Sequence, residues 1–291
     1  MSAMAEYAVR ETDVEYLRHG DSPLLVRIYH PEGEGPFPAI LWVHGGAWNA
    51  GSRTSDEAIN RPLAATGLLM ASVDFRTAPA HPYPAQIQDV PFATRWLKAH
   101  AADFNGDARV LGGIGASSGA HTLLLSTMRP RDPRYGAIPL PEAPDLDSTV
   151  DYAVTMWGML DPWNRYQFTQ ITPSAGEGFG GQARKLEQTL AYFLEEDAMH
   201  EGNPQEVIER GEAEHLPPIL LLQGTEDMNI PLTVPQRFAP AYKAVGGSIQ
   251  VEWFPGMLHR FAADPGPSTD RALALTQAFI REQIAAAAPP A

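Results

Sequence analysis

One stretch of the chain, residues 110–121, constrains the fold more than any other. A short apolar run leads into Gly115-Ala116-Ser117-Ser118-Gly119, and a helical pattern follows over residues 118–128. This order of strand, sharp turn and helix is typical of a G-x-S-x-G turn, which strains the backbone of its serine and lifts the hydroxyl clear of a sheet. A Cβ at either glycine would clash, because strand and helix approach closely there. The stretch therefore predicts an α/β fold with a nucleophilic serine at position 117.

Apolar runs alternate with helical patterns on both sides of this turn. The sequence predicts an opening antiparallel hairpin over residues 12–17 and 24–29, and buried strands over residues 38–43, 67–74, 152–157, 218–223 and 249–254. Helical spacing of apolar residues covers residues 55–66, 86–102, 234–245 and 269–286. Alternating strands and helices predict a mostly parallel sheet with helices on both faces.

One segment, residues 161–216, is too long for an ordinary connection. It holds a glycine-rich patch (Gly176, Gly178, Gly180 and Gly181) and a helical pattern near residues 184–196. A long insertion after a sheet strand is typical of a cap over a binding site, with a helical decoration packed elsewhere as the alternative. We expect one domain over residues 1–291 with this insertion as its cap, and a frayed tail over residues 285–291.

Composition narrows the class of partner. The formal net charge of −14 argues against nucleic acid and anionic membranes, which both need a basic surface, and favours a neutral or weakly charged substrate. The chain has no cysteine, which excludes disulfides and thiolate sites. No signal-peptide pattern opens the sequence and no apolar run is long enough to span a bilayer, so we expect a cytoplasmic protein.

Acyl transfer by a serine also needs a base and a group that orients the base, in the chain order serine, acid, histidine for this kind of fold. Asp227 follows the strand predicted at residues 218–223 and is the expected acid, with its neighbour Glu226 as the alternative. His259 follows the last predicted strand and is the expected base. Among the other histidines, His121 is expected to pack behind the turn, whereas His81 lies in a proline-rich loop from which it could reach the pocket.

The run His44-Gly45-Gly46-Ala47-Trp48 follows the strand predicted at residues 38–43. Glycines there allow backbone N–H groups to turn toward a substrate carbonyl. The expected oxyanion donors are the N–H groups of Gly46, Ala47 and Ser118, and the side chain of His44 is expected to anchor the loop.

These motifs, H-G-G-x-W, G-x-S-x-G, G-x-x-D and a late histidine, resemble those of α/β-hydrolase esterases with a hormone-sensitive-lipase-like oxyanion motif. The chain is more closely similar to bacterial carboxylesterases of the feruloyl-esterase and arylformamidase-like branch, which it also resembles at residues 74–76 and 83–89. The resemblance implies an eight-stranded sheet, a Ser-Asp-His triad and no cofactor. Ala47 stands where many such proteins have a third glycine, and Ser118 where alanine is frequent.

We therefore expect a serine carboxylic-ester hydrolase that acts on small to medium neutral esters through an acyl-enzyme, with no metal and no cofactor. The alternatives are hydrolysis of an amide or aryl formamide with the same triad, a non-catalytic ligand-binding homologue and, last, elimination chemistry. The oligomeric state stays open, with a homodimer as one option. Five aromatic residues could line the pocket or belong to the core: Trp48, Trp157, Trp163, Tyr166 and Phe168.

Overall fold

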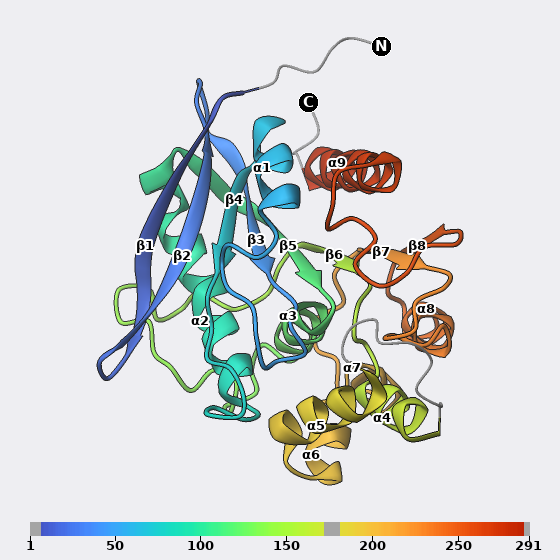
Figure 1. The fold of residues 1–291 in the computed structure, drawn as a ribbon. Coiled ribbons are helices and arrows are strands. Elements are labelled where there is room, and N and C mark those ends of the chain that lie inside the picture. The colour runs from blue at the N-terminus through green and yellow to red at the C-terminus, as the bar shows by residue number, and fades with distance from the viewer. Residues whose placement is uncertain (1–6, 172–180, 288–291) are drawn as a thin grey trace.

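Eight strands form one sheet in the computed structural model, which describes residues 7–171 and 181–287 (Figure 1). The opening hairpin is antiparallel, and β2 also pairs antiparallel with β4, whereas the pairs from β4 to β8 are parallel. The order across the sheet is β1-β2-β4-β3-β5-β6-β7-β8. The predicted α/β class and mostly parallel sheet are therefore confirmed. The strands are β1 (Val9–His19), β2 (Ser22–Pro31), β3 (Phe37–Val43), β4 (Leu69–Val73), β5 (Gly106–Ala116), β6 (Tyr152–Met156), β7 (Ile219–Gly224) and β8 (Ile249–Phe254).

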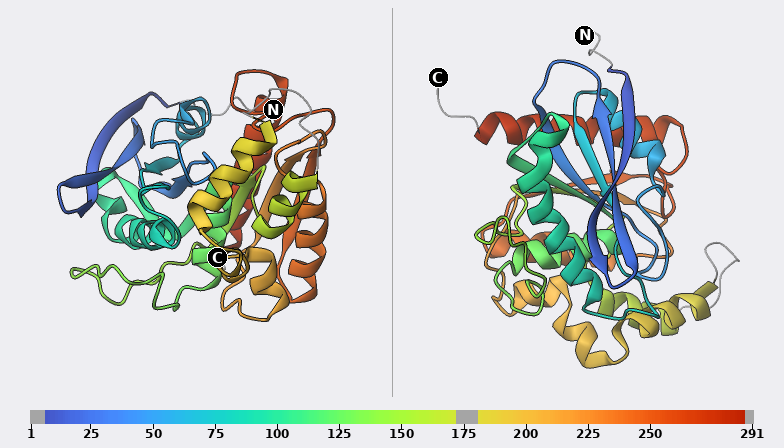
Figure 2. Two further views of the ribbon diagram at one scale, coloured as in Figure 1. Left: turned by 60° about the horizontal axis from the view of Figure 1, so that its bottom comes forward. Right: turned by 90° about the vertical axis from the view of Figure 1, so that its left-hand side faces the viewer.

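Helices cover both faces of the sheet (Figures 1 and 2). Alternate side chains of β3 pack on opposite faces of the sheet. Ile40 and Trp42 belong to the core with α1 (Glu57–Ala65) and α9 (Pro267–Ala287). Leu41 and Val43 belong to the other core, with α2 (Ala85–His100), α3 (Ser118–Met128) and α8 (Thr233–Ala244). A strand that is apolar at every position is thus buried on both sides, as its sequence predicts.

The long segment over residues 161–216 carries α4 (Pro162–Ile171), α5 (Gly181–Phe193), α6 (Glu196–Glu201) and α7 (Pro204–Glu209). These helices gather at one end of the molecule, beside the start of α3 (Figure 1). The sequence pattern indicated only the helix that became α5. Of the predicted glycine patch, Gly176, Gly178 and Gly180 lie outside the described residues. The prediction of a frayed tail from residue 285 is wrong at its start, because α9 continues to Ala287.

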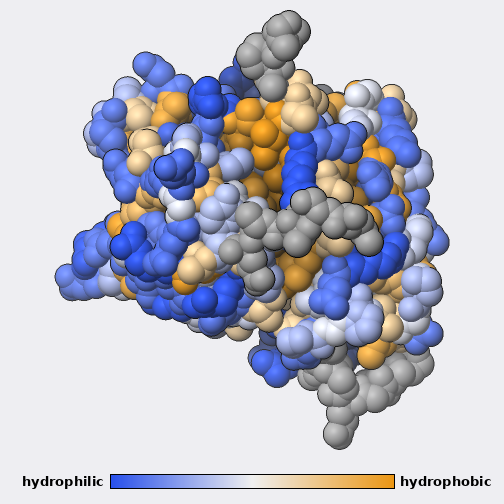
Figure 3. Space-filling view, turned by 90° about the horizontal axis from the view of Figure 1, so that it is seen from above, coloured by the Kyte–Doolittle hydropathy of each residue, from blue (hydrophilic) through white to orange (hydrophobic). Residues whose placement is uncertain are grey.

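A hollow of about 360 Å³ lies between the start of β4 and α9, away from the predicted site at Ser117. Leu68, Ile280 and Ile284 contribute apolar lining to it. Figure 3, which views the molecule of Figure 1 from above, shows apolar side chains gathered on that face. Among the described residues, no helix has both the length and the apolar character needed to cross a membrane.

Candidate active site

Ser117 occupies a sharp turn between β5 and α3. Its backbone has φ 51° and ψ −120°, a conformation that residues with a Cβ rarely adopt. The Ser117 N–H donates to the carbonyl oxygen of Met156 at 2.9 Å, which ties the turn to the end of the next strand. A Cβ on Gly115 would lie 2.5 Å from the Cα of Ala120, and one on Gly119 would overlap the carbonyl oxygen of Val43. Both glycines are therefore needed for α3 to pack against the sheet this closely.

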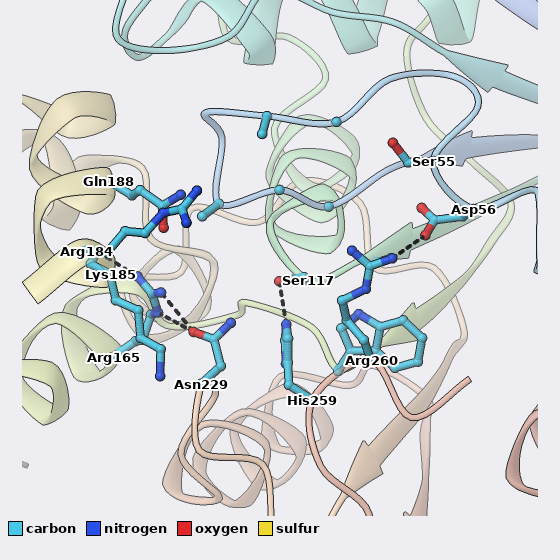
Figure 4. Close-up of a pocket in the computed structure, with 17 residues that line it drawn as sticks. Ser55, Asp56, Ser117, Arg165, Arg184, Lys185, Gln188, Asn229, His259 and Arg260 are labelled. Carbon is cyan, nitrogen blue, oxygen red and sulfur yellow. Dashed lines mark hydrogen bonds and ion pairs between the residues drawn. The ribbon is translucent and has the colours of Figure 1, made fainter. Parts of the chain in front are cut away.

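The imidazole of His259 lies beside the hydroxyl of Ser117 (Figure 4). The Ser117 hydroxyl donates to His259 Nε2 at 3.1 Å, and the His259 Nδ1–H donates to Asp227 Oδ2 at 2.8 Å. These three residues are far apart in the chain, and all are buried: Ser117 is 7% exposed, His259 6% and Asp227 4%. The structure thus brings the three predicted residues into one hydrogen-bonded line at the carboxyl end of the parallel strands.

Asp227 is fixed by its own loop, which follows β7. The backbone N–H groups of Asn229 and Ile230 donate to Oδ1 at 2.8 and 2.9 Å, and Gln223 Nε2 donates to Oδ2 at 3.0 Å. Burial alone would raise the pKa of the Asp227 carboxyl, but the His259 imidazole and the two N–H donors outweigh it and lower that pKa below its ordinary value. The carboxyl is therefore held ionised. Glu226, the alternative acid, points to solvent.

The loop after β3 adopts left-handed backbone conformations at Gly46, Ala47 and Trp48, with φ of 122°, 52° and 62°. Gly46 and Ala47 line the cavity that contains Ser117, and among the described residues their N–H groups have no acceptor. The Trp48 N–H donates to Ser118 Oγ at 3.2 Å. The hydroxyl of Ser118 is thus occupied with fixing this loop, while the Ser118 N–H opens the helix α3 and has no partner within it.

Two histidines support the same loop from behind. The indole N–H of Trp48 donates to His121 Nδ1 at 3.2 Å, and His121 Nε2–H donates to the carbonyl oxygen of Gly202 at 2.7 Å. Burial lowers the pKa of His121 to about 4, so this side chain stays neutral. His44 donates from Nδ1 to the Gly45 carbonyl at 2.7 Å and stacks on Phe75, with 4.1 Å between the ring centroids. His81 is exposed and does not line the cavity.

The cavity beside Ser117 has a volume of about 420 Å³. Of the five aromatic residues predicted for its wall, only Trp157 lines the cavity that the described residues form. Trp48 stacks on Tyr192 with 4.9 Å between ring centroids, because α5 packs directly on the glycine loop. Trp163 packs against His200 and Tyr166, and Phe168 lies half-buried on α4 outside the cavity wall. Trp48, Trp163, Tyr166 and Phe168 are thus not among the described residues that line this cavity, and Trp48 and Tyr166 are buried in the core, the alternative that the sequence left open.

Much of the cavity wall consists of polar side chains that the sequence did not predict. Asn229 is one, and its position two residues after Asp227 in the same loop could have indicated it. The adjacent pair of basic residues at 184 and 185, just after the glycine patch, is a second signal that the sequence carries. Those in the cavity wall include Asp56, Arg165, Arg184, Lys185, Asn229 and Arg260.

The described residues contain no group of three or more histidine and acidic side chains placed to hold a metal ion.

Comparison with known proteins places this site in a family. Esterase LipC of Mycobacterium tuberculosis is 32% identical over 247 residues, which cover 82% of this chain and 58% of LipC. Esterase LipQ of the same organism is 25% identical over 260 residues, covering 88% of this chain and 58% of LipQ. The chain thus spans under three fifths of the length of these curated relatives.

Solved esterase structures share the fold at low identity. A hyperthermophilic esterase of the archaeon Pyrobaculum calidifontis superposes with a TM-score of 0.78 at 22% identity, over 97% of this chain and 88% of the other. A propionate-bound thermophilic esterase of Thermogutta terrifontis superposes with a TM-score of 0.71 at 22% identity, over 99% and 98% of the two chains. The family model BD-FAE matches residues 26–241, a span that includes Ser117 and Asp227. The chain therefore has the α/β-hydrolase fold and belongs to the BD-FAE family.

Proposed function

We propose that this protein is a serine carboxylesterase that hydrolyses carboxylic esters through an acyl-enzyme. The observation that carries the proposal is the hydrogen-bonded line from Ser117 through His259 to Asp227, at 3.1 and 2.8 Å. Esterase names among the relatives and structural neighbours support the same reaction. Hydrolysis by serine needs this arrangement of nucleophile, base and orienting acid, and the chain order is the one α/β-hydrolases use.

In the first half-reaction, Ser117 Oγ attacks the ester carbonyl carbon while its proton moves to His259 Nε2. The negative charge of the tetrahedral intermediate falls on the carbonyl oxygen, which accepts hydrogen bonds from the N–H groups of Gly46, Ala47 and Ser118. Collapse of the intermediate breaks the bond to the alkoxy oxygen, and His259 returns the proton to the departing alcohol. Asp227 accepts from Nδ1–H throughout and stabilises the imidazolium.

The second half-reaction repeats these steps with water. His259 takes a proton from the water molecule, whose oxygen attacks the acyl carbon, and the same three N–H groups hold the second oxyanion. When the intermediate collapses, the bond to Ser117 Oγ breaks and His259 protonates that oxygen. The products are a carboxylic acid, an alcohol and free enzyme. We propose that residues 161–216 act as a cap, since α4 and α5 contribute side chains to the cavity wall.

The test is turnover of p-nitrophenyl esters together with labelling by a fluorophosphonate probe. Ser117→Ala should lower turnover by about 10⁴-fold or more and abolish labelling, because the nucleophile is lost while the fold is kept. Ser22→Ala, at an exposed serine of β2, should leave both unchanged. A matched anilide measured beside the ester separates ester from amide preference. Undiminished labelling of the Ser117→Ala protein would assign the reactive hydroxyl elsewhere and overturn the proposal.

A further inference from the structure

The wall of the cavity on the side of α4 and α5 is cationic. Arg165 comes from α4, and Arg184 and Lys185 come from the N-terminal half of α5. Figure 4 shows these three side chains together on one side of the Ser117–His259 pair. The molecule as a whole carries a net charge of −14, so this local excess of positive charge runs against its composition.

Arg165 is the most buried of the three, at 1% exposure. Its guanidinium donates to Asn229 Oδ1 at 2.8 Å and to Thr189 Oγ1 at 2.6 Å, both of them neutral oxygens. Burial lowers the pKa of Arg165 to about 10, a value at which the group still carries its charge at neutral pH. Arg76, which is partly buried, pairs with Asp89 at 2.9 Å, whereas the buried Arg95 donates to the carbonyl oxygens of Pro91 and Ile138. Arg165 makes no ion pair among the described residues, and the carboxylate of Asp227, which is hydrogen-bonded to His259, acts on it only through its field.

Lys185 and Arg184 also make no ion pair in the described part of the chain, although the charge of Asp227 acts on Lys185. The Lys185 side chain is buried, at 6% exposure for the residue, and Nζ donates to the carbonyl oxygen of Met228 at 3.0 Å. Burial and the nearby charge of Arg165 lower the pKa of Lys185. Arg184 is exposed and lines the cavity, and it makes no ion pair with the other described residues. Buried cations that form no ion pair are costly, and a second anion at this wall, beyond Asp227, would stabilise them.

The opposite side of the cavity differs. Arg260 there pairs with Asp56, with 3.6 Å between the guanidinium nitrogen and the carboxylate oxygen. That pair is neutral overall, so an anionic group gains nothing comparable from it. The asymmetry means that a charged substrate would be oriented with its anionic end against α4 and α5 and its ester carbonyl at Ser117.

We propose that the substrate of this enzyme is an ester that also carries a carboxylate, held by Arg184 and Lys185 in the field of Arg165. This inference rests on the proposed esterase function and adds the class of substrate. It replaces the neutral ester expected from the net charge, because the local charge at the binding wall decides recognition at close range. The carboxylate can belong to the acyl part or to the alcohol part of the ester.

The experiment compares kcat/KM for two matched pairs of esters, each corrected for its uncatalysed rate. p-Nitrophenyl hexanoate and mono-p-nitrophenyl adipate place a methyl or a carboxylate at the end of the acyl chain. Phenyl acetate and 4-carboxyphenyl acetate test the alcohol side. At least one anionic ester should be preferred about ten-fold or more over its neutral partner, and about 0.5 M salt should weaken the preference.

Variants then assign the preference to the wall. Arg184→Gln should lower kcat/KM for the preferred anionic ester about ten-fold, while the neutral ester stays within roughly two-fold. Lys185→Gln also removes the hydrogen bond to Met228 beside Asp227, so it should slow both esters, and the anionic ester more. Arg184→Glu should remove the preference altogether. Lys243→Gln removes an equal charge from the exposed face of α8 and should change neither ester. Arg184 is exposed, so its variants keep the test valid even where the Lys185 variant fails to fold.

The possible failures are distinguishable. Wild-type protein that hydrolyses none of the four esters contradicts the esterase proposal itself. Wild-type protein that hydrolyses the neutral esters as well as the anionic ones leaves the esterase proposal standing and overturns the carboxylate-bearing substrate. The same is true where Arg184→Gln lowers the rates for neutral and anionic esters equally.

Discussion

Single residues hold this site in conformations that the rest of the fold has to enforce. Ser117 is the sharpest case, since its φ of 51° is one that only glycine adopts without strain. Such a conformation costs of the order of 1–3 kcal/mol and persists only where the surroundings dictate it. Here those surroundings are the Ser117 N–H bond to Met156 and the contact of α3 with the end of β3. The strain should lower the free energy of unfolding by a measurable amount.

Two substitutions that both remove the hydroxyl should differ in stability. Ser117→Gly relieves the backbone strain, whereas Ser117→Ala keeps a Cβ in the same conformation. After the greater chain entropy of glycine is counted, we expect Ser117→Gly to have a free energy of unfolding about 1 kcal/mol above that of Ser117→Ala. Urea denaturation of the two variants measures this difference. An alanine variant as stable as the glycine variant would mean that the turn is unstrained.

At the scale of elements, the site depends on how closely α3 approaches β3. The chain can make this approach only because position 119 lacks a Cβ, which would overlap the carbonyl oxygens of Val43 and His44. Those two residues lead directly into the glycine loop that carries the free N–H groups. Any displacement of α3 therefore moves Ser117 and the proposed oxyanion donors relative to each other.

Gly119→Ala should be strongly destabilising. The added methyl meets backbone atoms that cannot swing aside, so we expect a loss of about 3 kcal/mol or more in the free energy of unfolding. Gly136→Ala is the matched control, because its Cβ would meet the Asp132 carbonyl at an ordinary 3.6 Å in an exposed loop. That variant should stay within about 0.5 kcal/mol of the wild type. Equal thermal denaturation midpoints for the two variants would contradict the close approach.

At the scale of the whole molecule, buried ionisable groups tie folding to pH. His121 is fully buried between Trp48 and the carbonyl oxygen of Gly202, and burial lowers its pKa from 6.5 to about 4. The unfolded chain binds this proton at its ordinary pKa, whereas the folded chain binds it only near pH 4. Between these two values acid favours the unfolded chain. The stabilisation from neutral His121 is complete above about pH 6.5 and is lost as the pH falls through this window.

The slope of stability against pH measures this effect. Between pH 6.5 and 4.5, the wild type should lose up to about 1.4 kcal/mol per pH unit from this one group. His121→Gln should be less stable at pH 7, because packing and hydrogen bonds are lost, but its slope should be shallower by that amount. His81→Gln, at an exposed histidine, should keep the wild-type slope. Parallel slopes for the wild type and His121→Gln would show that His121 has the same pKa in the folded and the unfolded chain.

Much of the fold could be predicted because it follows from local patterns. The inner strands β3, β4, β6 and β7 are largely apolar runs. Parallel strands bring their carboxyl ends to one edge of the sheet, so the loops after β5, β7 and β8 were expected to meet there. That rule is enough to bring Ser117, Asp227 and His259 together. The sequence could not show that most of the aromatic residues lie away from the cavity. Trp48 packs on α5 and Trp163 packs on α6, and both contacts join residues that are distant in the sequence. The cationic wall was missed for the same reason, since the direction of Arg165 depends on how α4 packs.

Asn229 contacts both the Asp227 carboxylate and Arg165, and this matters for any redesign of the cavity. Its backbone N–H holds the Asp227 carboxylate, while its side-chain oxygen holds the guanidinium of Arg165. A chimera that grafts residues 161–216 from another family member, in order to change what is bound, would leave this amide facing a foreign helix. Position 229 therefore has to be exchanged together with the graft. Otherwise, a redesign of specificity would also disturb the group that orients the imidazole.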